Sequence, residues 1–168
     1  DLAPSDRLVK QALQAKDERA WKAFAKRYRS EMKRPEAARL LALLAALSQR
    51  TDFSVGCYCS DEARCHRSVL RALLLEHGAD PNTAGKCQGS TLGPPLWVAV
   101  TNPNEDAVRL LLQFKANPNS EGLDEFKPLI EAAARGNQGI VELLLKAGAD
   151  TKAANRSGWT ALHAAVVN

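Results

Sequence analysis

Four side chains that could carry chemistry lie close together in the N-terminal half of the chain: Cys57, Cys59, Cys65 and His66. Thiolates and imidazoles bind zinc, and a cysteine between a strand and a helix start has its thiolate stabilised by backbone N–H groups and the helix dipole. Zinc-binding cysteines are usually separated by about two to four residues, so Cys-x-Cys followed by Cys-His fits a zinc site poorly. A phosphatase-like loop requires Cys-x5-Arg, whereas Arg64 comes one residue too early after Cys59.

The preferred interpretation of this cluster is that the cysteines are small buried apolar side chains. Asp61 and Glu62 also place negative charge where a bound phosphate would need positive potential. We therefore expect no enzyme activity, no catalytic residue, no metal and no cofactor. The alternative is a thiol- or metal-dependent enzyme or sensor that uses the cysteine cluster.

The elements that would position the cluster are mostly helices. Residues 53–59 have the pattern of a short strand, and Ser60 or Asp61 would cap a helix that ends near His77. Upstream, one helix is predicted after Pro4-Ser5-Asp6 and a second from about residue 18 to residue 33. The second helix places its large side chains on one face: Trp21, Phe24, Tyr28 and Met32.

A third predicted helix follows Pro35 and is apolar around most of its circumference, so we expect it to be buried. Its leucines are Leu40, Leu41, Leu43, Leu44 and Leu47.

Positive charge is concentrated in the first 50 residues, with 12 Lys and Arg against 6 Asp and Glu. Basic residues among aromatic ones suggest nucleic-acid binding through residues 22–33. The aromatic residues, however, share the core-facing stripe, so stacking on bases would require unpacking them. A solvated basic face is therefore preferred, and nucleic acid is not the expected partner.

The second half of the chain repeats itself at a regular interval. Leu110-Leu111-Leu112 recurs as Leu143-Leu144-Leu145, and Pro95-Leu96 recurs as Pro128-Leu129. The same pattern occurs earlier, at Leu73-Leu74-Leu75, but four additional residues lie between this copy and Leu110-Leu111-Leu112. Each unit has the pattern of two short helices followed by a loop.

Residues 158–165 (Gly-Trp-Thr-Ala-Leu-His-Ala-Ala) and residues 140–150 resemble the ankyrin-repeat signature, and the resemblance covers about residues 68–168. It implies a mostly α fold, an α-solenoid whose stacked repeats bury each other's apolar faces. The helices and the one short strand predicted upstream form an N-terminal helical segment before it. The predicted domains are an N-terminal helical segment at 1–60 and ankyrin repeats at 61–168. The repeats are a divergent unit at 61–82, full units at 83–119 and 120–152, and a truncated unit at 153–168.

The ankyrin resemblance implies a non-enzymatic module that binds another protein through its hairpin tips and the concave helix face. The tips correspond to residues 85–91, 121–126 and 155–159. The predicted partner-binding residues are Lys86, Gln88, Trp97, Glu121, Asp124, Phe126, Asn155, Arg156 and Trp159.

Two departures from the ankyrin pattern stand near the first tip. The four added residues fall within residues 83–94, where they either take part in binding or are neutral. Trp97 occupies the position where the ankyrin family usually has a histidine in a turn. In the next repeat Ile130 replaces this histidine as well, whereas His163 keeps it in the last repeat. Trp97 therefore either contacts the partner or packs against the longer loop.

The last repeat would leave Leu162, Ala165 and Val166 without a covering helix. Because the sequence starts at Asp1 and stops within an apolar stretch, we expect it to be part of a longer chain. Further repeats or a partner surface would then cover these residues, and self-association through the truncated repeat is one alternative.

The N-terminal segment is similar to the C-terminal half of the bacterial YeaO-like domain of unknown function, over about residues 1–75. The resemblance rests on residues 1–6, on Trp21-x2-Phe24-x2-Arg27-Tyr28-x2-Glu31 and on Asp61-Glu62-x2-Cys65-His66. It implies a fold fragment and little about function. Four cysteines without a spaced disulfide framework indicate a reducing, cytoplasmic location. The sequence contains no uninterrupted apolar run long enough to span a membrane, so no membrane association is expected.

Overall fold

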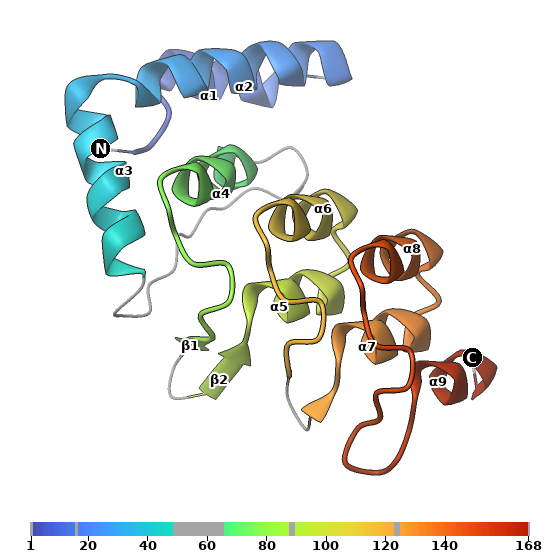
Figure 1. Cartoon of the computed structure of the whole chain (residues 1–168). Coiled ribbons are helices and arrows are strands. Elements are labelled where there is room, and N and C mark those ends of the chain that lie inside the picture. Colours follow the sequence, from blue (N-terminus) through green and yellow to red (C-terminus); the bar gives the residue numbers. More distant parts are fainter. Residues whose placement is uncertain (1, 16, 49–65, 88–89, 123–124, 168) are drawn as a thin grey trace. The chain divides into compact units, whose positions relative to one another are not determined.

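The computed structural model of the 168-residue chain describes residues 2–15, 17–48, 66–87, 90–122 and 125–167. The chain forms two compact units: an N-terminal unit, Asp1–Asp80, and a repeat unit, Pro81–Asn168. Most described elements are helices, which confirms the predicted mostly α fold class (Figure 1). The predicted strand at 53–59 lies outside the described residues, as do Cys57, Cys59 and Cys65.

The described N-terminal unit contains α1 (Asp6–Leu13), α2 (Glu18–Met32), α3 (Pro35–Leu47) and α4 (His66–Glu76). Asp17 caps α2, because its carboxylate accepts a hydrogen bond of 2.7 Å from the backbone N–H of Ala20. Pro35 occupies the first turn of α3, where its missing N–H costs no helical hydrogen bond. The three helices predicted upstream of residue 50 are therefore confirmed.

The core of the N-terminal unit is centred on the aromatic face of α2. Trp21, Phe24, Tyr28 and Met32 are all buried, as the spacing predicted. The Trp21 and Phe24 rings stack with their centroids 4.8 Å apart, and the Tyr28 hydroxyl donates to the Leu2 carbonyl at 2.5 Å. This face is therefore used for packing and is closed to base stacking in the folded state.

Helix α3 is less buried than its composition suggested. Leu41 is fully buried, but Leu43 is 54% exposed and Leu47 is 39% exposed, so the expected burial of the whole helix is wrong for these two leucines. Among the described elements α3 packs against α2 and α4. When a helix is apolar on all sides, its sequence does not indicate which side packs against other helices.

The repeat unit contains α5 (Pro95–Thr101), α6 (Glu105–Gln113), α7 (Pro128–Ala134), α8 (Gln138–Lys146) and α9 (Ala161–Val167). Helix α7 packs against both α5 and α9, and α8 packs against α6, so the helices form two rows (Figure 1). Asn104 and Asn137 occupy equivalent positions in successive repeats, and they cap α6 and α8 by accepting hydrogen bonds from backbone N–H groups. The sequence period thus corresponds to a repeated helix pair.

A loop precedes the first helix of each pair. The first loop contains a short antiparallel hairpin, β1 (Gly85–Cys87) and β2 (Ser90–Gly93), where the added residues were predicted. In the second loop the Gly122 N–H donates to the Phe126 carbonyl, and in the third the Asn155 N–H donates to the Trp159 carbonyl, both at 2.9 Å. These loops are called tip 1 (residues 85–91), tip 2 (121–126) and tip 3 (155–159).

Helix α9 exposes apolar side chains, as the sequence predicted. Leu162 is 73% exposed and Val166 is 78% exposed, whereas the equivalent Leu129 in α7 is buried. Ala165 is exposed as well. Within the described residues no helix combines the length and hydropathy that crossing a membrane requires.

Candidate protein-interaction surface

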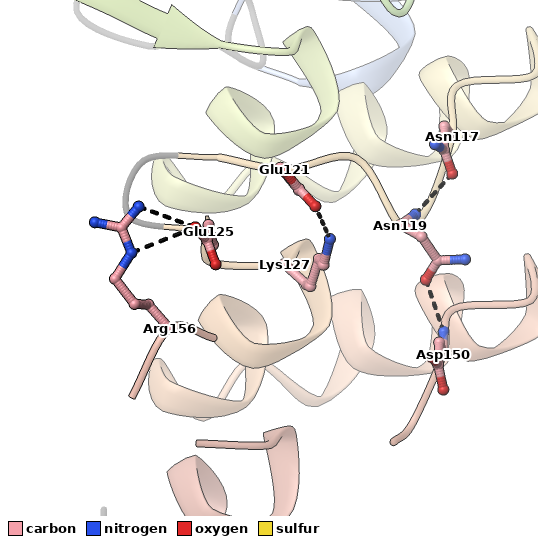
Figure 2. Close-up of polar contacts among 7 residues, drawn as sticks. All are labelled: Asn117, Asn119, Glu121, Glu125, Lys127, Asp150 and Arg156. Atoms are coloured by element: carbon pink, nitrogen blue, oxygen red, sulfur yellow. Dashed lines mark hydrogen bonds and ion pairs between the residues drawn. The ribbon is translucent and has the colours of Figure 1, made fainter. Parts of the chain in front are cut away.

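A row of asparagines fixes the spacing of successive loops in the repeat unit. Asn82 accepts a 2.7 Å hydrogen bond from the backbone N–H of Asn117, one repeat further along. Asn119 repeats this contact with the backbone N–H of Asp150 at 2.7 Å, and its amide donates to the Gly148 carbonyl at 3.3 Å. Figure 2 shows Asn117, Asn119 and Asp150 in this row. Each loop is therefore held to its neighbour by side chain to backbone contacts.

The next position in this row is different. Lys152 is the residue equivalent to Asn119 one repeat later, and an ammonium group has no acceptor for a backbone N–H. Asp150 accepts from the Lys152 N–H at 2.8 Å, just as Asn117 accepts from the Asn119 N–H at 2.9 Å, so this turn is kept in both repeats. The asparagine contact therefore stops at the third loop.

Trp97 joins the end of β2, which follows tip 1, to tip 2. Its indole lies against Gly93, where an added methyl group would come within 3.1 Å of Cε3. The ring also lies so close to Gly122 that a methyl group there would overlap it. Of the two alternatives for Trp97, these contacts match packing against the longer loop. Its indole Nε1 is buried and has no hydrogen-bond partner among the described residues.

An ion pair joins tip 2 to tip 3. The Arg156 guanidinium donates from Nη2 to Glu125 Oε1 at 2.9 Å and from Nε at 3.3 Å (Figure 2). The two residues lie 31 positions apart, so the pair crosses from one repeat to the next. Lys127, the residue that follows tip 2, has its Nζ 2.6 Å from Glu121 Oε1, and it lowers the pKa of the Glu121 carboxyl by hydrogen bonding and by its charge.

Tip 3 presents an aromatic pair. Trp159 is 43% exposed, and its ring centroid lies 6.3 Å from that of His163. His163 Nδ1 is 2.8 Å from Thr160 Oγ1, which confirms the turn-stabilising role that the ankyrin resemblance implied. Asn155 accepts from the N–H groups of Ser157 and Trp159, both at 3.0 Å, so its side chain shapes the turn that displays Trp159.

The structure thus brings most described members of the predicted set to the tips. Glu121, Arg156 and Trp159 are exposed, whereas Trp97, Phe126 and Asn155 are half-buried. Lys86 belongs to β1, and nothing further is described of its side chain. Gln88 and Asp124 lie outside the described residues.

The sequence interpretation missed Glu125, Lys127 and Gly122. The ion pair of Glu125 could have been predicted, because Glu125 is an acidic residue that lies about one repeat before the basic Arg156. Gly122 offered no comparable signal, because its contact with Trp97 depends on how two loops approach each other.

In the N-terminal unit, His66 is the one member of the predicted cysteine cluster that the structure describes. It is half-buried at the start of α4, and its ring meets Tyr28 edge-on at a centroid distance of 6.2 Å. Burial lowers the pKa of His66, and the charge of Arg67 lowers it further. Among the described residues, no group of three or more His, Cys, Asp or Glu side chains could hold a metal ion.

Comparison with known families finds two matches in this chain. A model described as "Ankyrin repeats (3 copies)" matches residues 96–168, and one described as "Active DUF488-N3 subclade" matches residues 1–78. Both predicted resemblances, to ankyrin repeats and to a domain of unknown function, are confirmed. The first match falls within the repeat unit and the second within the N-terminal unit.

Individual relatives are similar to the chain over part of its length. A Notch-regulated ankyrin repeat-containing protein from Xenopus laevis is 42% identical over 71 residues, which are 40% of this chain and 62% of that protein. The glycerophosphocholine phosphodiesterase gde1 of Schizosaccharomyces pombe is 34% identical over 59% of this chain and 8% of its own length. The chain therefore spans less than two thirds of these relatives.

Among solved structures, the ankyrin repeat domain of Bcl-3, described as a unique member of the IkappaB protein family, is similar at a TM-score of 0.49. It is 33% identical, and the similarity covers 57% of this chain and 40% of that one.

Proposed function

We propose that this chain, whose residues 96–168 are ankyrin repeats, recognises another protein through the hairpin tips of its repeat unit. The observation that supports this most strongly is that the tips are joined. Trp97 packs between Gly93, at the end of β2 just after tip 1, and Gly122 of tip 2. The Arg156–Glu125 pair connects tip 2 to tip 3. A surface held in one arrangement before binding loses less conformational freedom when a partner docks.

Tip 3 supplies the anchors of the proposed contact. Trp159 is 43% exposed and the Arg156 side chain is 75% exposed, so both are accessible to a partner. Tryptophan and arginine are the residue types most often found at the energetic centre of protein interfaces. Arg156 pairs with Glu125, and Lys127 pairs with Glu121. The surface therefore carries both signs of charge and favours a partner with polar groups of both signs over a polyanion.

Two finer expectations accompany this proposal. The concave row of helices would add contact area beside the tips, as the ankyrin resemblance implies. The cytoplasmic location expected from the cysteine pattern would give the chain a reducing environment in which a free-cysteine protein is stable.

The proposal is tested by capturing partners from a lysate on the purified chain and comparing variants by quantitative mass spectrometry. We expect a partner enriched by the native chain to lose about tenfold or more of its enrichment when Trp159→Ala and Arg156→Ala are combined. The matched control combines Glu142→Ala and Lys146→Ala, which breaks an exposed ion pair of α8 and should leave enrichment unchanged. Equal loss in both double variants would contradict the assignment to the tips.

The alternative, a thiol- or metal-dependent activity at the cysteine cluster, stays a separate prediction because its cysteines lie outside the described residues. It predicts bound metal in the purified chain or a cysteine that reacts unusually fast with iodoacetamide. Absence of metal and ordinary labelling rates would remove it without affecting the tip proposal.

A further inference from the structure

A hollow between α1 and α2 of the N-terminal unit has no role in the proposed protein recognition. Its volume is about 420 Å³, which lies within the range of small-molecule sites. Its floor includes the buried side chain of Leu8. The other residues that line it are Ser5, Arg7, Gln11, Arg27, Ser30, Glu31 and Arg34.

The charge of this lining is positive. Arg7, Arg27 and Arg34 are three of the eight residues that line the hollow, and Glu31 is the single acidic residue among them. Both oxygens of the Glu31 carboxylate already accept hydrogen bonds from Ser5, one from its N–H at 3.1 Å and one from its hydroxyl at 2.6 Å. The carboxylate is therefore engaged with the wall, and an excess of positive charge faces the hollow.

One arginine is held in position by its neighbour. Arg27 Nη1 donates to Gln11 Oε1 at 2.7 Å, a bond between α2 and α1. This bond uses one N–H group of the guanidinium and orients the planar fork at the wall of the hollow. A guanidinium held in this way can still present N–H groups to an oxyanion.

We propose that this hollow binds the phosphate group of a small phosphorylated molecule. Several arginines together with the hydroxyl of Ser30 match the charge and the many acceptor oxygens of a compact dianion, whereas the Ser5 hydroxyl already donates to Glu31. A nucleic-acid strand is the less suitable occupant, because the Trp21 and Phe24 rings of α2 are buried and cannot stack on bases. The site is distinct from the tips, so its presence or absence leaves the proposed protein recognition unchanged.

The proposal is tested by isothermal titration of the whole chain at low ionic strength with three probes: inorganic phosphate, adenosine 5′-monophosphate and a short single-stranded oligonucleotide. We expect both phosphate probes to bind, with the nucleotide tighter if the natural ligand is a phosphomonoester and the two equal if it is free phosphate. Binding of the oligonucleotide alone would overturn the proposal in favour of an extended polyanion surface. No heat from either phosphate probe would also overturn it.

Variants separate a built site from general surface charge. Arg34→Gln removes an exposed guanidinium of the hollow and should weaken phosphate binding by about tenfold. Arg39→Gln removes the same charge from an exposed position of α3 that does not line the hollow and should leave binding unchanged. Equal weakening in the two variants would contradict a localised site.

Glu31→Gln provides a test of opposite sign. The amide can accept from the Ser5 N–H and donate to the Ser5 hydroxyl, so the wall keeps its hydrogen bonds while losing a negative charge. Phosphate affinity should then rise severalfold. A fall in affinity with an unchanged circular dichroism spectrum would contradict the proposed electrostatics.

Discussion

The N-terminal unit and the repeat unit achieve stability by different arrangements of contacts. Among the described residues of the N-terminal unit, Phe24 and Tyr28 of α2 pack in a core with residues of α1, α3 and α4. The repeat unit is built instead from contacts that recur at each helix pair, and neighbouring loops are joined by Asn82 and Asn119. One core substitution should therefore destabilise the whole N-terminal unit, whereas one substitution in the repeat unit should weaken a single interface between repeats.

The largest effect is expected from Phe24→Ala in the N-terminal unit. Phe24 is 2% exposed and its ring stacks against both Trp21 and Tyr28. Removing it should lower the free energy of unfolding by about 3–5 kcal/mol, because a large buried ring is lost and its cavity cannot close. Urea denaturation followed by circular dichroism measures this, and a loss below about 1 kcal/mol would mean that the unit is not organised around this ring.

Equivalent leucines of successive repeats offer the next test. Leu129→Ala in α7 should cost about 2–5 kcal/mol, because the side chain is 4% exposed. Leu162→Ala in α9, one repeat later, should cost less than about 1 kcal/mol, because that side chain is 73% exposed. Denaturation at two protein concentrations checks both variants. A concentration-dependent cost for Leu162→Ala would instead support self-association through α9.

Part of this structure could be predicted from the sequence, and part could not. Periodicity identified the buried stripe of α2 from the spacing of apolar residues along one helix, and the repeat period from apolar runs that recur one repeat later. The exposed face of α9 followed from the truncation of the last repeat, which leaves this helix without a covering one. Periodicity could not predict that Leu43 and Leu47 are exposed, since α3 is apolar on nearly all sides. It also missed the contact between Trp97 and Gly122, which arises only when two loops of different repeats come together.

A smaller effect is expected in the asparagine row. Asn119→Ala removes the acceptor for the Asp150 N–H and the donor to the Gly148 carbonyl, and should cost about 1 kcal/mol. Lys152→Ala at the equivalent position of the next repeat is the control and should be close to neutral, because its exposed side chain does not make this contact. Thermal unfolding of the two variants side by side distinguishes them. Similar melting temperatures would show that the row does not hold the loops together.

The smallest effect on stability is expected where the backbone turns after the second helix of a repeat. Lys115 adopts a φ of 66°, whereas Gly148, the equivalent residue one repeat later, has a φ of 87°. A side chain in this left-handed region is strained, so Lys115→Gly should stabilise the chain by about 0.5–1 kcal/mol. The reverse change, Gly148→Ala, should destabilise it by a similar amount, although nothing lies within 4 Å of the added methyl group. If Lys115→Gly lowers the melting temperature, backbone strain is not what separates these repeats.

The most direct test of tip recognition is site-specific photo-crosslinking in cells that make the chain. A benzophenone side chain would replace Ser157 in tip 3 or, as the control, Glu142 on α8, both of which are exposed. The proposed function predicts a crosslink to a distinct second polypeptide from position 157 and none from position 142. Crosslinks of equal yield from both positions, or from position 142 alone, would contradict recognition through the hairpin tips.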